Sequence, residues 1–288
     1  MEWLVALFIA LFTPGLAGPP AGGGAGDGGV TIPLDPLEAD ANGPLPAVTR
    51  ARTANAPLVV IDAGHGGRDP GATSAFVTRP EKDITLALAL AIRDALAATG
   101  RVRVAMTRDD DTYLLLADRY QIARRLDADL FISIHADAAP LNDGARGATI
   151  YTLSEVASDR EAAQLAGSQN QADRIGGARL SPDPGVNLIL IDLAQRESMN
   201  VSADFARLLY REAGPIFPFR PDWHRFAGFI VLKAPDIPSI LFESGYLTNQ
   251  VDAAYISSPE GRRQIAEGMR RAIEAHFARR LLAPARVG

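Results

Sequence analysis

The feature that most constrains the fold of this chain is the regular alternation of short apolar segments with amphipathic ones. The apolar segments are expected to form strands: 58–63, 102–107, 129–135, 147–153, 228–234 and 239–243. The segments with helical spacing of apolar residues are 82–99, 113–126, 188–213 and 259–282. Near-continuous apolar strands that alternate with helices indicate a sheet covered on both faces. We therefore expect an α/β fold, with a single layered domain over residues 57–283.

One segment, residues 154–185, departs from this alternation because it lies between an expected strand and an expected helix. Ser158 and Glu161 have the spacing of a capping box, so a helix is expected to start there. Within residues 159–173, Leu165 is the one large apolar residue, so this helix has little apolar surface with which to dock. A weakly docked helix inserted into an α/β domain indicates a lid or regulatory element.

The N-terminus has the pattern of an export signal. Residues 3–12 form an apolar run of ten, too short to cross a bilayer as one helix, which needs about 20 residues. Small residues follow, so residues 1–17 are expected to be a signal peptide and the mature chain to have no transmembrane segment. Glu2 and the absence of Lys or Arg before the run are atypical, and the alternative is a buried N-terminal helix. Residues 18–56, rich in Gly and Pro, are expected to be a flexible linker.

Composition limits the chemistry that this domain can perform. The chain contains no cysteine, which excludes disulfides, iron–sulfur clusters, cysteine zinc sites and a thiol nucleophile. A metal ion must therefore be held by His, Asp or Glu, and the chain has four histidines: His65, His135, His224 and His276. The net charge of −5 indicates no basic surface for nucleic acid, so no nucleic-acid partner is expected.

Two of these histidines are placed where α/β proteins bind their ligands. His65 follows the first expected strand in a glycine-rich turn, and His135 ends the third. Ligands bind at the carboxyl ends of strands in an α/β sheet, so both side chains are expected at one site. A third ligand must then offer oxygen, and Glu81 and Glu243 are both candidates. Two histidines and one glutamate, with a fourth position open to water, are typical of catalytic zinc.

Each of these residues also has a structural interpretation. Thr78 and Glu81 have capping-box spacing, so Glu81 could simply cap the helix that follows it. A histidine in a loop is more often a hydrogen-bonding residue than a ligand, and Glu243 could be a carboxylate bonded to loop amides. His276 on the last helix and His224 in an aromatic-rich loop are assigned no metal role, although that loop could line a substrate groove.

Four ordered motifs together resemble a known family. They are VVIDAGHGGRDPGA at 59–72, Glu81 before a long helix, ADLFISIHADA at 128–138 and SILFESGYLTN at 239–249. This pattern resembles the zinc-dependent N-acetylmuramoyl-L-alanine amidases of type 3, and among them the periplasmic cell-division amidases of Gram-negative bacteria. The resemblance covers about residues 57–280, the whole of the expected domain.

The resemblance implies both a fold and a site. The fold is a mixed sheet of about six strands flanked by helices, which agrees with the layers expected above. One Zn²⁺ ion would be bound by His65, Glu81 and His135, and Glu243 would be the catalytic glutamate. The implied reaction is hydrolysis of the amide between N-acetylmuramic acid and L-alanine in peptidoglycan, in the periplasm, for septal cleavage at cell division. The rival hypotheses are a zinc carboxypeptidase that acts on wall peptides and a non-catalytic peptidoglycan-binding adaptor.

The resemblance also implies regulation. In this group an inserted helix covers the active site until a LytM-domain activator displaces it, so residues 154–185 would be an autoinhibitory helix segment. In relatives a glutamate of that helix binds zinc, and the matching residue here is Gln169. Glutamine is a poorer zinc ligand than a carboxylate, so Glu155 or Glu161 could substitute, or the helix could block the site sterically. The expected partners are peptidoglycan and a LytM-domain activator, and the chain is expected to be a monomer.

Overall fold

The computed structural model describes residues 43–139, 142, 144–175 and 188–282. The chain divides into two units, Met1–Leu37 and Glu38–Gly288, and all described residues belong to the second. The predicted signal peptide, residues 1–17, lies outside the described residues.

The described residues form six strands and a set of helices around them. The strands are β1 (Leu58–Ala63), β2 (Arg103–Met106), β3 (Leu130–Asp137), β4 (Ala148–Leu153), β5 (Phe219–Ala227) and β6 (Ser239–Tyr246). The helices are α1 (Glu81–Thr99), α2 (Leu116–Arg125), α3 (Arg160–Gln169), α4 (Ala172–Ile175), α5 (Leu188–Ala213), the 3-10 turn η1 (Ile230–Leu232), α6 (Gln250–Ser257) and α7 (Pro259–Leu282). None of the helices in this part of the chain is both long enough and apolar enough to cross a membrane.

The strands form one mixed sheet in the order β2-β1-β3-β6-β4-β5. β2, β1, β3 and β6 run parallel, whereas β4 is antiparallel to β6 and parallel to β5. Parallel strands need crossover connections, and α1 and α2 supply them between β1, β2 and β3. The predicted α/β fold with a mixed sheet of six strands is confirmed.

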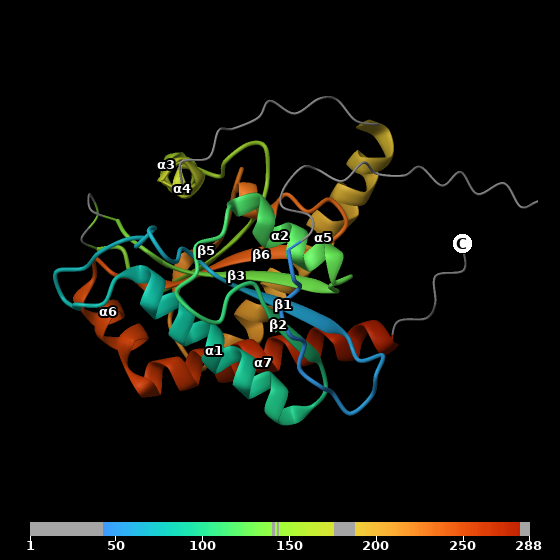
Figure 1. Cartoon of the computed structure of the whole chain (residues 1–288). Helices are drawn as coiled ribbons and strands as arrows, with labels where there is room; N and C mark the ends of the chain where they lie inside the picture. The colour runs from blue at the N-terminus through green and yellow to red at the C-terminus, as the bar shows by residue number, and fades with distance from the viewer. Residues whose placement is uncertain (1–42, 140–141, 143, 176–187, 283–288) are drawn as a thin grey trace, which may run out of the picture. The chain divides into compact units, whose positions relative to one another are not determined.

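Helices cover both faces of this sheet, and Figure 1 shows α1 and α7 on one side and α2 and α3 on the other. Side chains alternate along β1, so Val59 and Ile61 join one core while Val60 joins the core on the opposite face. Leu88 of α1 and Ile273 of α7 are fully buried in the first core. Every residue of β1 is buried, which explains why its sequence is almost continuously apolar.

The prediction of a strand at 228–234 is wrong. Residues Ile230–Leu232 form the single turn η1, and the strand in this region is β5, which ends at Ala227. The turn is apolar because it packs into the core on the α2 side of the sheet. β5 contains Pro221 and several charged residues, which conceal a strand in the sequence. Proline is tolerated there because β5 lies at the edge of the sheet.

The packed region also begins earlier than predicted. The backbone N–H of Thr49 donates to the oxygen of Val104 in β2 at 2.8 Å, and that of Arg52 donates to the oxygen of Gly100 at 2.8 Å. Both residues lie within 18–56, the predicted linker, so the last part of that span is not a free linker. β2 is an edge strand, so one side of its backbone is available for hydrogen bonds, and the segment that contains Thr49 makes one of them.

Candidate metal centre

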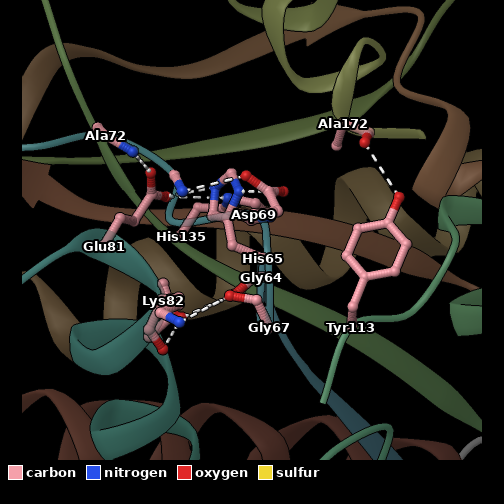
Figure 2. A network of polar contacts seen from close by, with 12 residues as sticks. Gly64, His65, Gly67, Asp69, Ala72, Glu81, Lys82, Tyr113, His135 and Ala172 are labelled. Atoms are coloured by element: carbon pink, nitrogen blue, oxygen red, sulfur yellow. Dashed lines mark hydrogen bonds and ion pairs between the residues drawn. The ribbon is translucent and has the colours of Figure 1, made fainter. Parts of the chain in front are cut away.

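The loop after β1 places His65 at the carboxyl end of the sheet. Its backbone has a left-handed φ of 61°, which turns the chain sharply after the strand. A Cβ atom at the preceding Gly64 would lie 2.4 Å from Cε1 of His135. Glycine is therefore required there for the two imidazole rings to approach, with their centroids 4.9 Å apart. Figure 2 shows both rings beside the side chain of Glu81.

Three side chains offer ligand atoms to one point. Oε1 of Glu81 lies 3.1 Å from Nε2 of His65 and 3.1 Å from Nδ1 of His135. All three residues are buried, and their ligand atoms lie within 4.8 Å of one another. His65 follows β1, His135 lies on the adjacent strand β3, and Glu81 begins α1. The structure thus brings together the three residues that the sequence predicted to share a site.

Glu81 does not cap its own helix. The residue before α1 is Pro80, which makes no side-chain capping bond. The Glu81 carboxylate instead accepts hydrogen bonds from the backbone N–H groups of Ala72, at 2.8 Å, and Ala136, at 3.0 Å. The alternative interpretation, in which Thr78 and Glu81 form a capping box, is therefore wrong. The two amides hold the carboxylate toward the histidines.

The donor set and its surroundings fit a zinc ion. Oδ2 of Asp69 lies 2.8 Å from Nδ1 of His65, which orients the ring and directs Nε2 toward Glu81. Metal-binding histidines commonly donate their other ring nitrogen to a carboxylate in this way. Nε2 of His65 is buried and makes no hydrogen bond within the described residues, although Glu81 is near. Two imidazoles and a carboxylate are the ligands of many catalytic zinc sites.

The electrostatics of these side chains favour a bound positive charge. Burial lowers the pKa of His65, but Glu81 and Asp69 outweigh it and raise that pKa to about 9. Burial raises the pKa of Glu81, but the two histidines lower it well below its usual value. An ionised carboxylate thus faces a protonated imidazole, at the point where a metal cation would take the place of the proton.

A buried ion pair that was not predicted from the sequence holds the His65 loop. Arg119 of α2 donates at 2.8 Å to Oδ1 of Asp62 and to the backbone oxygens of Ala63 and His65. Asp62 is fully buried and also accepts a hydrogen bond from Ser133 at 2.6 Å. Buried charges persist when they are paired and hydrogen-bonded this fully. An aspartate inside an otherwise apolar strand was the sequence signal that could have identified the pair.

Glu243 lies on the strand next to His135. β6 pairs with β3 so that Glu243 and His135 are in register. The Glu243 side chain is fully buried, and neither of its carboxylate oxygens has a hydrogen-bond partner in the described part of the chain. Burial, together with the charges of Asp137 and Glu81, raises the pKa of Glu243 well above its usual value. A carboxyl group in these surroundings is placed to accept and return a proton.

A further buried carboxyl group, Asp137, was not predicted from the sequence. It ends β3 two residues after His135 and lines the same cavity as His65. Burial raises the pKa of Asp137 to about 7, and the charges of Glu81 and Glu161 act in the same direction. The sequence signal that could have identified Asp137 was a second polar residue, after His135, at the end of an apolar strand.

The helix α3 borders the cavity over the candidate metal centre. This cavity has a volume of about 520 Å³, and its lining includes His65, Glu81 and, from α3, Glu161 and Gln169. Gln169, the residue matched to a zinc-binding glutamate, is therefore brought to the site. Of the two possible substitutes, Glu161 lines the cavity, whereas Glu155 is exposed.

Polar contacts hold α3 against the sheet. Its buried apolar residues are small, Ala162 and Ala166. Asp159, rather than Ser158, caps the helix by accepting a hydrogen bond from the backbone N–H of Ala162 at 2.9 Å. Asp159 also pairs with Arg225 of β5, whose Nε lies 3.0 Å from Oδ2. Charge and hydrogen bonding, more than apolar burial, therefore hold this helix.

The two remaining histidines lie outside the candidate metal centre. His224 lies on β5 rather than in a loop, and its Nε2 is 3.1 Å from Oγ1 of Thr152. His276 lies on α7 and packs edge to face on Phe205, with ring centroids 5.3 Å apart. Within the described residues, neither belongs to a group of side chains that could hold a metal.

Known proteins resemble this chain in sequence over the same region. Residues 59–275 match the family model described as N-acetylmuramoyl-L-alanine amidase. AmiC of Escherichia coli O6:H1 is 36% identical over 222 residues, which are 77% of this chain and 53% of that protein. AmiC of Neisseria meningitidis serogroup B is 36% identical over 242 residues, which are 83% of this chain and 58% of that protein. The chain thus spans little more than half the length of these two curated relatives.

Solved structures resemble this chain in fold. The catalytic domain of CwlV, an N-acetylmuramoyl-L-alanine amidase from Bacillus (Paenibacillus) polymyxa, is 25% identical and superposes with a TM-score of 0.58. The superposition covers 77% of this chain and 98% of that domain. The family match also contains His65, Glu81, His135 and Glu243. This chain belongs to the N-acetylmuramoyl-L-alanine amidase family, type 3.

Proposed function

We propose that this chain is a zinc-dependent hydrolase that cleaves the amide between N-acetylmuramic acid and L-alanine in peptidoglycan. The observation that carries the proposal is the convergence of His65, Glu81 and His135 beside the buried, unpartnered Glu243. Family membership supports this substrate over the peptide bond of a wall carboxypeptidase. The intact set of four side chains favours an enzyme over a non-catalytic adaptor.

Zinc would be held by Nε2 of His65, Nδ1 of His135 and a carboxylate oxygen of Glu81. When bound, the ion would supply Lewis acidity, which polarises the scissile carbonyl group and lowers the pKa of water. Asp69 keeps the His65 ring in the orientation that presents Nε2 to the site. Three protein ligands leave room for the reacting groups, as in other catalytic zinc sites.

Glu243 transfers the proton in this proposal. Its carboxylate accepts a proton from the water that attacks the lactyl carbonyl, while a bond forms between the water oxygen and the carbonyl carbon. Glu243 then donates that proton to the nitrogen of L-alanine as the carbon–nitrogen bond breaks. The products are a glycan strand with a free lactyl carboxyl group and a stem peptide with a free amine. Neither carboxylate oxygen of Glu243 is engaged by another described residue, which suits a group that must accept and then donate a proton.

In this proposal α3 of the inserted segment 154–185 keeps the site closed; residues 176–185 of that segment lie outside the described residues. α3 borders the cavity, so a polymeric substrate would have to displace the helix to reach His65 and Glu81. We assign this displacement to a LytM-domain activator at the division septum. The substrate lies outside the cytoplasm, which agrees with export to the periplasm by a signal peptide of residues 1–17.

A variant that weakens the α3 contacts tests this proposal. The opened variant combines Asp159→Asn with Glu161→Gln, which removes the negative charges that pair with Arg225 and Arg220. The matched control is Glu155→Gln, which neutralises an exposed carboxylate of the same segment. Each mature protein is incubated with purified sacculi, with and without chelator, and the released fragments are identified by mass spectrometry.

The proposal predicts that the opened variant releases peptides that begin with L-alanine, that wild type and Glu155→Gln release far less, and that chelator stops the release. Equal release by wild type and the opened variant would disprove self-inhibition but not the reaction. If the zinc-loaded opened variant released no such peptides, the proposed reaction would be disproved.

A further inference from the structure

We infer that Arg220 and Arg225 form a subsite for a carboxylate of the substrate's peptide arm, and that Glu161 of α3 occupies this subsite as a substitute for that carboxylate. The inference rests on the proposed function, because it describes how the same site recognises its substrate. Oε1 of Glu161 lies 2.6 Å from Nη1 of Arg220 and 3.2 Å from Nη1 of Arg225. Two guanidinium groups thus converge on one carboxylate oxygen, and arginine is the side chain best suited to bind carboxylates.

The sheet, rather than α3, fixes the positions of these arginines. Nη1 of Arg225 donates to the hydroxyl of Tyr151 in β4 at 2.9 Å, and Nη1 of Arg220 contacts the hydroxyl of Tyr246 in β6. The Tyr246 hydroxyl also lies 3.4 Å from Oε1 of Glu161. The side chain of Arg225 is 3% exposed, and that of Arg220 is 12% exposed. The carboxylate therefore sits in a polar pocket whose walls belong to three strands of the central sheet.

The charge of this pocket changes when α3 leaves. Asp159, the N-cap residue of α3, and Glu161 within the helix carry two negative charges against the two arginines. Asp222 is the one acidic residue of β5 and lies 2.9 Å from Nε of Arg220. Without α3, the strand would keep two arginines and one aspartate, so positive charge would exceed negative charge, and Arg225 would lose the carboxylates of Asp159 and Glu161. A carboxylate supplied by a ligand would restore the balance.

Attachment of a helix does not by itself explain why its contact contains the buried Arg225 and the half-buried Arg220. Replacing buried ion pairs by apolar residues is often neutral or stabilising, so an apolar face would hold α3 at least as well. A charged face suits a surface that is at times uncovered and then binds an anion. This observation favours a ligand subsite over a purely structural contact.

The pocket lies where a peptide attached at the metal centre would pass. Glu161 lines the cavity that contains His65 and Glu81. Arg220 lines a second cavity of about 510 Å³, and Asn142 lines both cavities. In this inference the peptide arm, with its amide bond at the metal ligands, runs past Asn142 toward Arg220.

The peptide arm of peptidoglycan offers the matching chemistry. Its first residue is the L-alanine whose amide bond is cleaved, and the D-glutamate that follows carries a carboxylate close to the scissile bond. A pair of arginines in this pocket would select such an acidic group over a neutral one. Recognition of this carboxylate and closure by α3 would then be mutually exclusive.

Binding to the zinc-loaded opened variant tests this inference. The probes are the dipeptide L-alanyl-D-glutamate and its diamide, and calorimetry gives the dissociation constants. The dipeptide is expected to bind at least about tenfold more tightly than the diamide, because charge-assisted hydrogen bonds contribute that much. Wild type, in which Glu161 fills the subsite, is expected to bind the dipeptide at least about tenfold more weakly than the opened variant.

Substitutions in the opened variant identify the residues responsible. Arg220→Gln is expected to abolish the preference for the acid, and Arg220→Lys to retain part of it. Arg263→Gln, which removes a 68% exposed arginine of α7, is the matched control and is expected to leave the preference unchanged. Circular dichroism establishes that each variant is folded. Should Arg220→Gln not fold, the comparison of wild type with the opened variant decides the matter.

Equal affinities for dipeptide and diamide in the opened variant, or a preference that survives Arg220→Gln, would overturn the inference. These outcomes are separate from failure of the proposed function. An opened variant that releases peptides from sacculi without preferring the acid leaves the proposed reaction intact. If the opened variant prefers the acid although wild type is equally active, the arginine subsite stands, and both self-inhibition and the occupation of the subsite by Glu161 are disproved.

Discussion

Glu243 and His135 occupy paired positions on adjacent parallel strands, so the two side chains face the same side of the sheet at its carboxyl edge. The two candidate glutamates, Glu81 and Glu243, differ in their hydrogen bonds. Glu81 accepts hydrogen bonds from two backbone amides and lies between the histidines, whereas Glu243 has no partner within the described residues. A fixed carboxylate suits a metal ligand, and a buried carboxylate without partners suits proton transfer.

Asp69 is expected to strengthen zinc binding through His65. Asp69→Asn should weaken zinc affinity about 10- to 100-fold, because the carboxylate that orients Nδ1 of His65 is lost. Competition with a chromogenic chelator measures the affinity. Asp111→Asn is the matched control, since this carboxylate is 56% exposed and bonds the backbone of Gly67 in the same loop. Unchanged zinc affinity in Asp69→Asn would contradict the orienting role.

Gln169 is expected to make inhibition by α3 weaker than it would be with a carboxylate at this position. Gln169→Glu places a negative charge in the cavity that contains His65 and Glu81, so it should tighten zinc binding and slow the release of peptides from sacculi. Gln171→Glu adds the same charge at an exposed position and should change neither. Faster release by Gln169→Glu than by wild type would show that this residue does not face the metal in the closed state.

His276 is expected to make stability depend on pH. Burial, with the charge of Arg280, lowers the pKa of His276 to about 4, while the unfolded chain has the usual pKa near 6.5. The unfolded state therefore takes up a proton first as the pH falls, and the free energy of unfolding decreases between pH 6.5 and pH 4. One such group contributes at most about 1.4 kcal/mol for each pH unit.

The variant His276→Leu should reduce this loss of stability. His224 has a pKa lowered in the same direction, to about 4, so a part of the loss should remain. Denaturant unfolding of the chelator-treated proteins at pH 7 and pH 5 measures the difference. An unchanged difference between the two pH values in His276→Leu would rule out the contribution of this histidine.

The parallel half of the fold could be predicted from sequence because its strands are buried on both faces. β1 and β3 have long runs of Val, Ile, Leu and Phe, and each is separated from the next strand by a helical pattern or a turn. β5 could not be predicted, because an edge strand that carries Arg220, Pro221, Asp222 and Arg225 has the composition of a loop. The turn η1, which follows β5, is apolar because it packs into the core and not because it pairs with a strand.

The part of the candidate site whose residues lie at the ends of strands could be predicted from the sequence. His65 and His135 follow from that placement, and Glu81 and Glu243 then complete a list of oxygen donors. Placement at strand ends left the choice between the glutamates open. The family resemblance implied it, and the hydrogen bonds of the folded chain give a physical reason for it. The roles of Asp62 and Arg119 also needed tertiary structure, because the pair joins β1 to a helix 57 residues away in sequence.

The central claim is that Glu243 performs proton transfer at a metal centre that it does not itself bind. The most direct measurement compares the opened variant with and without Glu243→Gln, by zinc content from elemental analysis and by mass spectrometry of peptides released from sacculi. The account predicts equal zinc in both proteins and a loss of peptide release of about 10²- to 10⁴-fold in Glu243→Gln. Peptide release close to that of the opened variant, or loss of zinc along with activity, would contradict it.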